Sequence, residues 1–217
     1  MKAGDKHYRA WIGPPQFYDL KSSSQFTLLT SFLNMRETSK LLDIGCGSLR
    51  LGRLAIVYLK QGHYFGVEPE EWLVKDGIKS ELGQEIITMK QPHITHTREF
   101  DFTSFGEKFD YIIAQSIFSH AALWQIKKCM KNAKNVLEPN GRFVFNYGVG
   151  KQDYTGNDWV YPGCVSYTPK TMHQVAEDLN LHWAEIEIPI SFSKHWMVVA
   201  KNKTALNICQ NFLKGDK

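Results

Sequence analysis

Short apolar runs alternate along the chain with stretches in which apolar residues recur at helical spacing. Such runs predict buried strands, and such spacing predicts helices with one apolar face. The predicted strands cover residues 40–44, 63–67, 110–114 and 141–147, a segment within 93–98, and an antiparallel pair at 182–188 and 196–201. The predicted helices cover residues 22–35, 48–60, 69–82, 121–137 and 169–179. Strands that alternate with helices are typical of βαβ units and a mostly parallel sheet.

Capping and turn residues set the expected ends of several elements. The serines at 22–24 can cap the first helix, and Pro69 suits the first turn of the third helix. The Pro-Asn-Gly segment at 139–141 predicts a turn. Residues 148–167 form a predicted loop rich in aromatic side chains, and a loop of this length in a compact domain is often functional.

The composition narrows the class of protein. The 217 residues, 43% of them hydrophobic, suit one domain with a substantial core. No apolar stretch reaches the ~20 residues that span a bilayer, and the first residues show no secretory signal. We therefore expect a cytoplasmic protein with no membrane partner. The four cysteines lack C-x-x-C spacing, which argues against a zinc knuckle or a disulfide framework.

The net charge of +4 arises at the two ends of the chain. Basic residues exceed acidic ones in residues 1–40 and 201–217, whereas residues 41–200 are slightly acidic. Nucleic-acid-binding domains concentrate Lys and Arg on one face of the body. We therefore do not expect nucleic acid as a partner.

A glycine turn follows the first predicted strand, in the segment LLDIGCGS at 41–48. Glycines allow a sharp turn and the close approach of a ligand, which suits a dinucleotide or S-adenosylmethionine. The dinucleotide fingerprint G-x-G-x-x-G requires glycine where this chain has Arg50. Glu68 lies 21 residues after Gly47 and can accept hydrogen bonds from both ribose hydroxyls, or it can be a carboxylate favoured by a helix dipole. With the glycine turn upstream, we favour ribose binding.

Four segments, LLDIGCG, HYFGVEP, FDYIIAQSIFSHA and LEPNGRFVFNY, resemble the successive motifs of class I S-adenosylmethionine-dependent methyltransferases. They occur in that family's order, and the resemblance covers roughly residues 38–201. It implies a Rossmann-like α/β fold whose seven-stranded, mostly parallel sheet has helices on both faces and an antiparallel last strand. It also implies a methyltransferase domain at 38–217, preceded at 1–37 by an extension and helix that cover the cofactor site, in a single domain overall.

The resemblance assigns cofactor contacts residue by residue. It places the methionine part of S-adenosylmethionine at the glycine loop, the ribose at Glu68, the adenine beside Asp101 or Phe102, and a position facing cofactor and substrate at Gln115. The implied cofactor-binding residues are Asp43, Gly45, Cys46, Gly47, Glu68, Asp101, Phe102, Gln115, Tyr18 and Gln25. The chain departs from the family at Leu49, where many members have a third glycine, and in the size of the loop after the fifth strand.

Several methyltransferase subclasses lack their residues here. Enzymes that methylate DNA amino groups or glutamine amides carry [DN]PP[YF] where this chain reads AQSIF at 114–118. Gln115 is a poor ligand for a hard cation, and His93 and His96 have no further ligand nearby in sequence, so we expect no metal. No cysteine occupies the place of the nucleophile in cytosine methylases.

The remaining expectation is in-line methyl transfer from S-adenosylmethionine to O or N of a small organic molecule, with S-adenosylhomocysteine as the product. His120 is the first candidate for a general base, although it can equally be a structural histidine, and Tyr147 is a second candidate catalytic residue. Candidate substrate contacts are Asn146, Trp159, Tyr161 and His195. The loop aromatics form either a lid or aromatic box over the substrate, or a loop packed on itself.

Three other functions stay open on the sequence. The chain can methylate a protein or RNA, can bind S-adenosylmethionine without catalysis, or can be a nucleotide-dependent oxidoreductase. The slightly acidic body disfavours the first, and Arg50 in the fingerprint disfavours the last. Arg50 itself can pair with the cofactor carboxylate or lie on the surface. We expect a small-molecule methyl acceptor as the partner and a monomer or homodimer.

Overall fold

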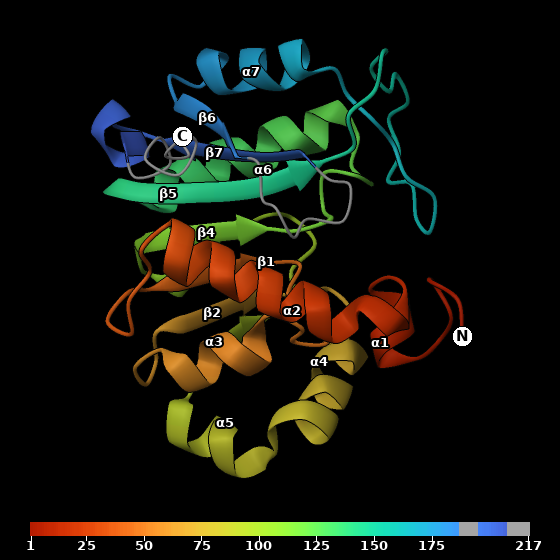
Figure 1. Cartoon of the computed structure of the whole chain (residues 1–217), viewed down its shortest axis with the longest axis vertical. Helices are drawn as coiled ribbons and strands as arrows, with labels where there is room; N and C mark the ends of the chain where they lie inside the picture. Colours follow the sequence, from red (N-terminus) through yellow and green to blue (C-terminus); the bar gives the residue numbers. More distant parts are fainter. Residues whose placement is uncertain (187–194, 208–217) are drawn as a thin grey trace, which may run out of the picture. The chain divides into compact units, whose positions relative to one another are not determined.

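The computed structural model describes residues 1–186 and 195–207 (Figure 1). They form two compact units, one of residues 1–99 and one of the described residues from 100 onward. The seven strands follow the order β3-β2-β1-β4-β5-β7-β6. Strand β7 is antiparallel to both of its neighbours, whereas β1 with β2, β2 with β3, and β4 with β5 are parallel pairs. These observations confirm the predicted seven-stranded, mostly parallel sheet with an antiparallel last strand.

The first unit contains three parallel strands, β1 (Leu41–Ile44), β2 (Tyr64–Val67) and β3 (His93–Thr95). Leu41 pairs with Tyr64, and Phe65 pairs with His93. Every residue of β1 and β2 is buried, as expected for parallel strands covered on both faces. The continuous apolar runs in the sequence therefore locate these two strands closely, and the short strand expected within 93–98 is also present.

Helices of the first unit begin at residues other than the predicted ones, and those at 8–11 and 84–90 were not predicted. They are α1 (Tyr8–Trp11), α2 (Tyr18–Thr27), α3 (Gly52–Tyr58), α4 (Glu71–Gly77) and α5 (Gln84–Lys90), with single turns η1 (Pro15–Phe17), η2 (Leu28–Phe32) and η3 (Ile78–Leu82). The prediction that serines 22–24 cap a helix is wrong, because α2 begins four residues earlier. Ser22 is buried inside α2 and donates its hydroxyl proton to the Arg50 carbonyl.

The second unit contains β4 (Phe109–Ala114), β5 (Leu137–Tyr147), β6 (His182–Ile186) and β7 (His195–Ala200). Its helices are α6 (Leu123–Val136) and α7 (Pro169–Asp178), with short turns η4 (Thr103–Phe105) and η5 (Lys203–Leu206). The antiparallel pairing of β6 with β7 is confirmed, and Figure 1 shows α7 beside β6. The predicted turn at 139–141 is instead an irregularity within β5, where the register with β4 shifts between Phe109 and Tyr111.

Buried ion pairs attach the N-terminal segment to the rest of the first unit. The Glu81 carboxylate, almost wholly buried, accepts hydrogen bonds from Arg9 Nη2 at 2.6 Å and Arg53 Nη1 at 3.0 Å. Asp19 also contacts both guanidinium groups. The Arg9 guanidinium lies 4.6 Å from the centroid of the Tyr18 ring. Charge-assisted bonds of this kind are stronger than neutral ones and fix α1 and α2 against α3.

No helix within the described part of the chain is both long and apolar enough to cross a membrane.

Gly77 allows α4 to approach the segment that follows β1, which generates a first prediction. A Cβ on Gly77 would overlap the Ser48 carbonyl oxygen, and backbone cannot move aside as a side-chain end can. Gly77→Ala should gain up to about 1 kcal/mol of helix propensity but lose about 1–3 kcal/mol to overpacking. We expect a net destabilisation in urea unfolding followed by circular dichroism.

The matched control for this substitution is Asp76→Ala, on the exposed face of the same helix. It should change stability by no more than about 0.5 kcal/mol. A Gly77→Ala variant as stable as this control would show that the helix does not depend on this close approach.

Candidate functional site

The glycine loop begins where β1 ends and is held by the end of β2. The backbone N–H groups of Gly45 and Cys46 both donate to the Val67 carbonyl, at 2.8 and 3.1 Å. Gly45 and Gly47 have φ values of +69° and +56°, in the left-handed region that glycine adopts without strain. The loop therefore turns sharply at a fixed position beside β2.

Leu49 marks the departure from the family's third glycine. It is fully buried and has a φ of +60°, a conformation that a branched side chain rarely adopts. Its N–H donates to the Cys46 carbonyl at 3.0 Å, which closes the turn that leads into α3. The backbone at this position thus keeps a glycine-like conformation although the residue is leucine.

Glu68 lies directly after β2 and contacts the glycine loop. Its Oε2 accepts the Gly47 N–H at 3.0 Å, and its Oε1 accepts the Glu70 N–H at 2.9 Å. Burial raises the pKa of this carboxyl, and the two backbone donors oppose that rise. A carboxylate offers about four acceptor positions, so two remain for further donors. The helix-terminus interpretation also has support, because Glu70 is the N-cap of α4.

Asp43 and Arg50 are two buried groups of opposite charge near this loop. Asp43 is 5% exposed and accepts a hydrogen bond from Tyr64 Oη at 2.8 Å. Burial raises the pKa of Asp43 to about 7, against the opposing effects of the Tyr64 hydrogen bond and the Arg50 charge. Arg50 is 7% exposed, and burial lowers its pKa to about 10. The surface interpretation of Arg50 is therefore wrong.

Residues of the N-terminal segment lie against the same loop. Tyr18 is buried and donates its hydroxyl proton to the Ser48 carbonyl at 3.1 Å. Arg50 Nη1 donates to the Ile12 carbonyl at 3.0 Å, and the Ile12 side chain packs beside Gly47. Gln25 is buried on α2, and its Oε1 has no hydrogen-bond partner. The structure thus brings Tyr18 and the 11–13 segment to the glycine loop of the first unit.

Cys46 packs its thiol against β2 within the same loop. A Cβ built on Gly66 would lie 3.0 Å from the Cys46 sulfur, and burial raises the pKa of this thiol. Cys129 is also a buried free thiol and Cys164 an exposed one, while Cys209 lies outside the described residues. Cys46 is thus inert packing beneath the loop, and its backbone remains the group that can face a ligand.

Three predicted cofactor residues belong to the second unit and are described there by themselves. Asp101 is exposed, and its carboxylate accepts hydrogen bonds from the N–H and hydroxyl of Thr103. Phe102 is fully buried. Gln115 follows β4 directly and has a buried Oε1 without a hydrogen-bond partner. The adenine and substrate roles of these residues stay predictions.

His120 lies between two aromatic rings of the long loop. The ring centroids of Trp159 and Tyr161 are 5.8 and 5.2 Å from that of His120. His120 Nδ1 is 2.9 Å from the Val160 carbonyl oxygen and 2.7 Å from that of Gly163. Since carbonyl oxygens only accept, Nδ1 carries the proton, and in the neutral ring Nε2 carries the lone pair.

The loop from 148 to 167 is held in place by several hydrogen bonds. The Val160 and Val165 N–H groups donate to the carbonyls of His120 and Ser119, each at 2.8 Å. Tyr167 is fully buried and donates to the Ala121 carbonyl. Trp159, by contrast, is 42% exposed. The loop therefore combines an internally packed part with an exposed aromatic side chain beside His120, and the lid or aromatic box over a substrate stays a prediction.

Tyr147 and His195 meet where β5 ends and β7 begins. They are register partners, with ring centroids 5.7 Å apart. Tyr147 is fully buried, its hydroxyl has no hydrogen-bond partner, and burial together with the Glu185 charge raises its pKa. Asn146 is buried beside it and accepts the Ser116 N–H at 2.7 Å through Oδ1. His120, Tyr147 and His195 thus all lie at the carboxyl edge of the parallel pair β4–β5.

Glu185 is a residue that sequence reasoning missed. Its Oε1 is 2.7 Å from His173 Nε2, and its Oε2 is 3.0 Å from His195 Nε2, the latter an electrostatic contact without hydrogen-bond geometry. Burial opposes ionisation, but the two histidines lower the pKa of Glu185 below its ordinary value. The three residues come from α7, β6 and β7, so no sequence spacing could have indicated the group.

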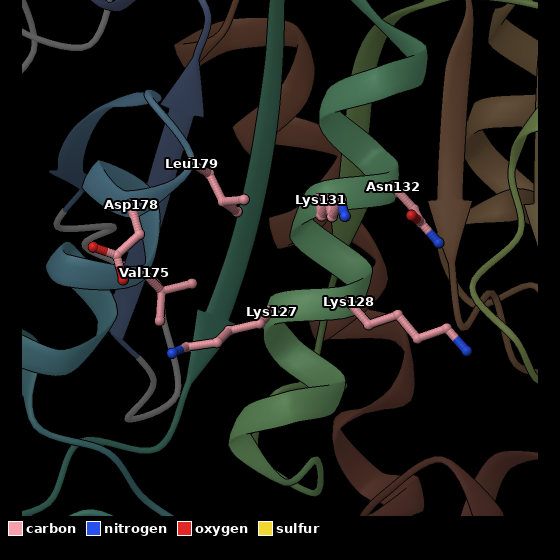
Figure 2. Close-up of a pocket in the computed structure, with 7 residues that line it drawn as sticks. All are labelled: Lys127, Lys128, Lys131, Asn132, Val175, Asp178 and Leu179. Atoms are coloured by element: carbon pink, nitrogen blue, oxygen red, sulfur yellow. The ribbon is translucent and has the colours of Figure 1, made fainter.

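In the described part of the chain, no group of three or more His, Cys, Asp or Glu side chains is arranged to hold a metal ion. His93 stacks on Phe65, and His96 Nδ1 bonds to the Glu68 carbonyl. A cavity of about 360 Å³ lies between α6 and α7 (Figure 2). Its lining is Lys127, Lys128, Lys131, Asn132, Val175, Asp178 and Leu179, none of which is a predicted site residue.

The buried Asp43 generates a prediction about the pH dependence of stability. Its folded pKa of about 7 exceeds that of an unfolded aspartate, about 3.9, so the folded state binds more protons between these values. Stability from this group is therefore lost as pH rises from about 4 to 7. The difference in unfolding free energy between Asp43→Asn and the wild type should grow by at most about 1.4 kcal/mol per pH unit in that window.

Urea unfolding at pH 5, 6 and 7 measures this difference, and Asp76→Asn on the exposed face of α4 is the control. The control curve should run parallel to the wild type. A parallel Asp43→Asn curve would show that Asp43 is already ionised at pH 5, held so by the Tyr64 hydroxyl and the Arg50 charge.

Solved structures of similar fold are methyltransferases. Magnesium protoporphyrin IX methyltransferase from Synechocystis PCC 6803, with bound S-adenosylmethionine, matches with a TM-score of 0.62 at 14% identity, over 86% of this chain and 81% of that one. An S-adenosylmethionine-dependent methyltransferase from Clostridium acetobutylicum ATCC 824 matches with 0.59 at 14%, over 91% and 93%. The glycopeptide N-methyltransferase MtfA, complexed with S-adenosylhomocysteine, matches with 0.60 at 12%, over 83% and 88%.

A search of curated proteins finds no match to this sequence. A family model described as a methyltransferase domain matches residues 36–206, which is most of the chain. This match includes the glycine loop, Glu68, and the strands and helices from β1 to β7. The chain therefore belongs to the methyltransferase-domain family, in the class I, S-adenosylmethionine-dependent group with a Rossmann-like fold.

Proposed function

We propose that this methyltransferase transfers a methyl group to an oxygen or nitrogen of a small organic molecule. The proposal rests on the surroundings of His120. Its Nδ1 lies within hydrogen-bond distance of two carbonyl oxygens, and its ring lies beside those of Trp159 and Tyr161. Such a group binds an organic molecule by stacking and can accept its proton at Nε2. The names of two similar structures, a magnesium protoporphyrin IX methyltransferase and a glycopeptide N-methyltransferase, are consistent with acceptors of this class.

The first unit supplies residues that fit the cofactor. Glu68 keeps two acceptor positions that match two ribose hydroxyls, and the glycine loop of Asp43, Gly45, Cys46 and Gly47 offers backbone at which the methionine part can lie. We assign Asp101 or Phe102 to the adenine and Gln115 to the side facing the acceptor, as the family resemblance implies. When bound, S-adenosylmethionine supplies a methyl group on a sulfonium, which is displaced in line.

The residues at the edge of the second unit then bind and orient the acceptor. Trp159 and Tyr161 pack on its apolar part, and His120 Nε2 takes the proton from the attacking atom. Asn146 and His195 contact its polar groups, and the unbonded hydroxyl of Tyr147 donates to the acceptor atom.

Calorimetry tests the cofactor assignment. S-adenosylmethionine and S-adenosylhomocysteine should bind with micromolar affinity, and NAD should not bind. Glu68→Gln should weaken S-adenosylhomocysteine by about 1.5–3 kcal/mol, the usual cost of losing hydrogen bonds to a charged group. Glu70→Gln, whose carboxylate pairs with Arg98, is the matched control and should leave affinity unchanged. Binding of NAD, or equal effects of the two substitutions, would remove the assignment.

A methyl-transfer assay tests the acceptor and the base. With methyl-labelled S-adenosylmethionine, we expect label in at least one member of a panel of phenols, amines and carboxylic acids. His120→Asn should then lower turnover by about 10²–10⁴-fold while S-adenosylhomocysteine affinity is kept. His182→Asn, at the exposed start of β6, is the control and should keep full turnover.

Two results would contradict this proposal. Label transferred to protein or RNA, and to none of the small molecules, would move the function to a macromolecular acceptor. Unchanged turnover in His120→Asn would leave alignment, without a base, as the contribution of this histidine.

A further inference from the structure

Two buried polar atoms of the first unit have no hydrogen-bond partner close to the glycine loop. Arg50 is 7% exposed, and its Nε is buried without an acceptor. Gln25 is 4% exposed, and its Oε1 is buried without a donor. A buried unsatisfied group costs about 1–3 kcal/mol, and more if it is charged, so such groups are rare unless a ligand satisfies them.

Local contacts place both groups beside the loop. Arg50 follows Gly47 by three residues, and its Nη1 is held by the carbonyl of Ile12, whose side chain contacts Gly47. Gln25 lies one helical turn after Ser22, and Ser22 donates to the backbone carbonyl of Arg50. The face of α2 that carries Ser22 and Gln25 is therefore the face turned toward the segment containing Arg50.

The charges of this cluster are also unusual. The Arg50 guanidinium forms no ion pair with any carboxylate in the described part of the chain, although it is nearly buried. Asp43 is close enough for each charge to affect the pKa of the other, without a direct bond between them. Burial of a cation with an unused N–H beside an incompletely paired carboxylate is costly by itself. A ligand that carries both charges would satisfy both groups.

The atoms that need partners define the chemistry of that ligand. An unused guanidinium N–H requires an anionic acceptor, and a planar carboxylate matches its geometry. The unused Gln25 oxygen and the Asp43 carboxylate require a donor, and an ammonium matches both. Carboxylate and ammonium on adjacent atoms are the two groups of an α-amino acid.

We propose that Arg50 binds the α-carboxylate at the amino-acid end of S-adenosylmethionine, and that Gln25 accepts a hydrogen bond from its α-ammonium. This inference rests on the proposed cofactor site and adds the residues that hold the end remote from the ribose. Glu68 accepts the N–H of Gly47, and the side chain of Ile12, whose carbonyl holds Arg50, lies where a Cβ on Gly47 would point.

The test compares two ligands that differ only at the amino-acid end. S-adenosylhomocysteine carries the α-amino acid, and 5′-methylthioadenosine has the same adenosine and thioether without it. In calorimetry, Arg50→Gln should raise the Kd of S-adenosylhomocysteine 10–100-fold and leave the Kd of 5′-methylthioadenosine within twofold. Arg50→Lys should recover part of the loss, because it restores the charge without the planar fork.

Arg36→Gln is the matched control, because Arg36 is an exposed arginine of the same unit whose guanidinium bonds to the Asn34 side chain. It should change the affinity of both ligands by less than threefold. Gln25→Leu should weaken S-adenosylhomocysteine about 5–20-fold, with no effect on 5′-methylthioadenosine. Thermal unfolding of each variant shows whether the fold is kept.

An equal loss for both ligands in a folded Arg50→Gln variant would overturn the inference and make Arg50 a structural residue. If this variant does not fold, the wild-type protein provides the test. It should bind S-adenosylhomocysteine at least tenfold more tightly than the analogue that lacks only the α-carboxylate. Equal affinities for these two ligands would overturn the inference. Wild-type protein that binds neither S-adenosylhomocysteine nor 5′-methylthioadenosine would contradict the proposed function itself, which is a different result.

Discussion

The hydrogen bonds that tie the glycine loop to the end of β2 are the constraint on which the rest of the first unit depends. The Val67 carbonyl accepts hydrogen bonds from two loop N–H groups, and the Glu68 carboxylate accepts one from a third. These bonds fix the loop and satisfy backbone N–H groups that would otherwise be unpaired. This places a carboxylate against a sharp turn with spare acceptor positions. The same bonds that stabilise the turn therefore hold Glu68 in the position that the proposed ribose site requires.

Burial sets the chemical character of this region. Asp43, Arg50 and Glu68 are nearly excluded from water, and the charged form of each is disfavoured by desolvation. Chains rarely keep such groups buried for stability, because apolar residues would pack at lower cost. Buried charged groups are in an unfavourable state when no ligand is bound. Because only a ligand of matching charge removes this free-energy cost, such groups can bind a ligand with more selectivity.

The sequence predicts the parts of this fold that depend on local patterns. Fully buried strands read as continuous apolar runs, so β1 and β2 were located within a residue. The start of α2 was missed because Ser22 resembles a cap, whereas its hydroxyl bonds to a carbonyl 28 residues away. Glu185 was missed because it and its two histidine partners come from three different elements. These contacts join residues that are far apart in the sequence, so no characteristic spacing of residues indicates them.

The edge of the second unit shows why the acceptor side is harder to derive than the cofactor side. A cofactor of constant structure requires the same kinds of binding residues. A glycine turn followed by an acidic residue can therefore be recognised in the sequence. An acceptor is held mainly by packing, which aromatic residues supply at any spacing within a loop. What the structure adds is the tautomer of His120, because two carbonyls hold the proton on Nδ1. In the neutral ring, that assignment leaves Nε2 as the nitrogen that the proposed proton transfer would use.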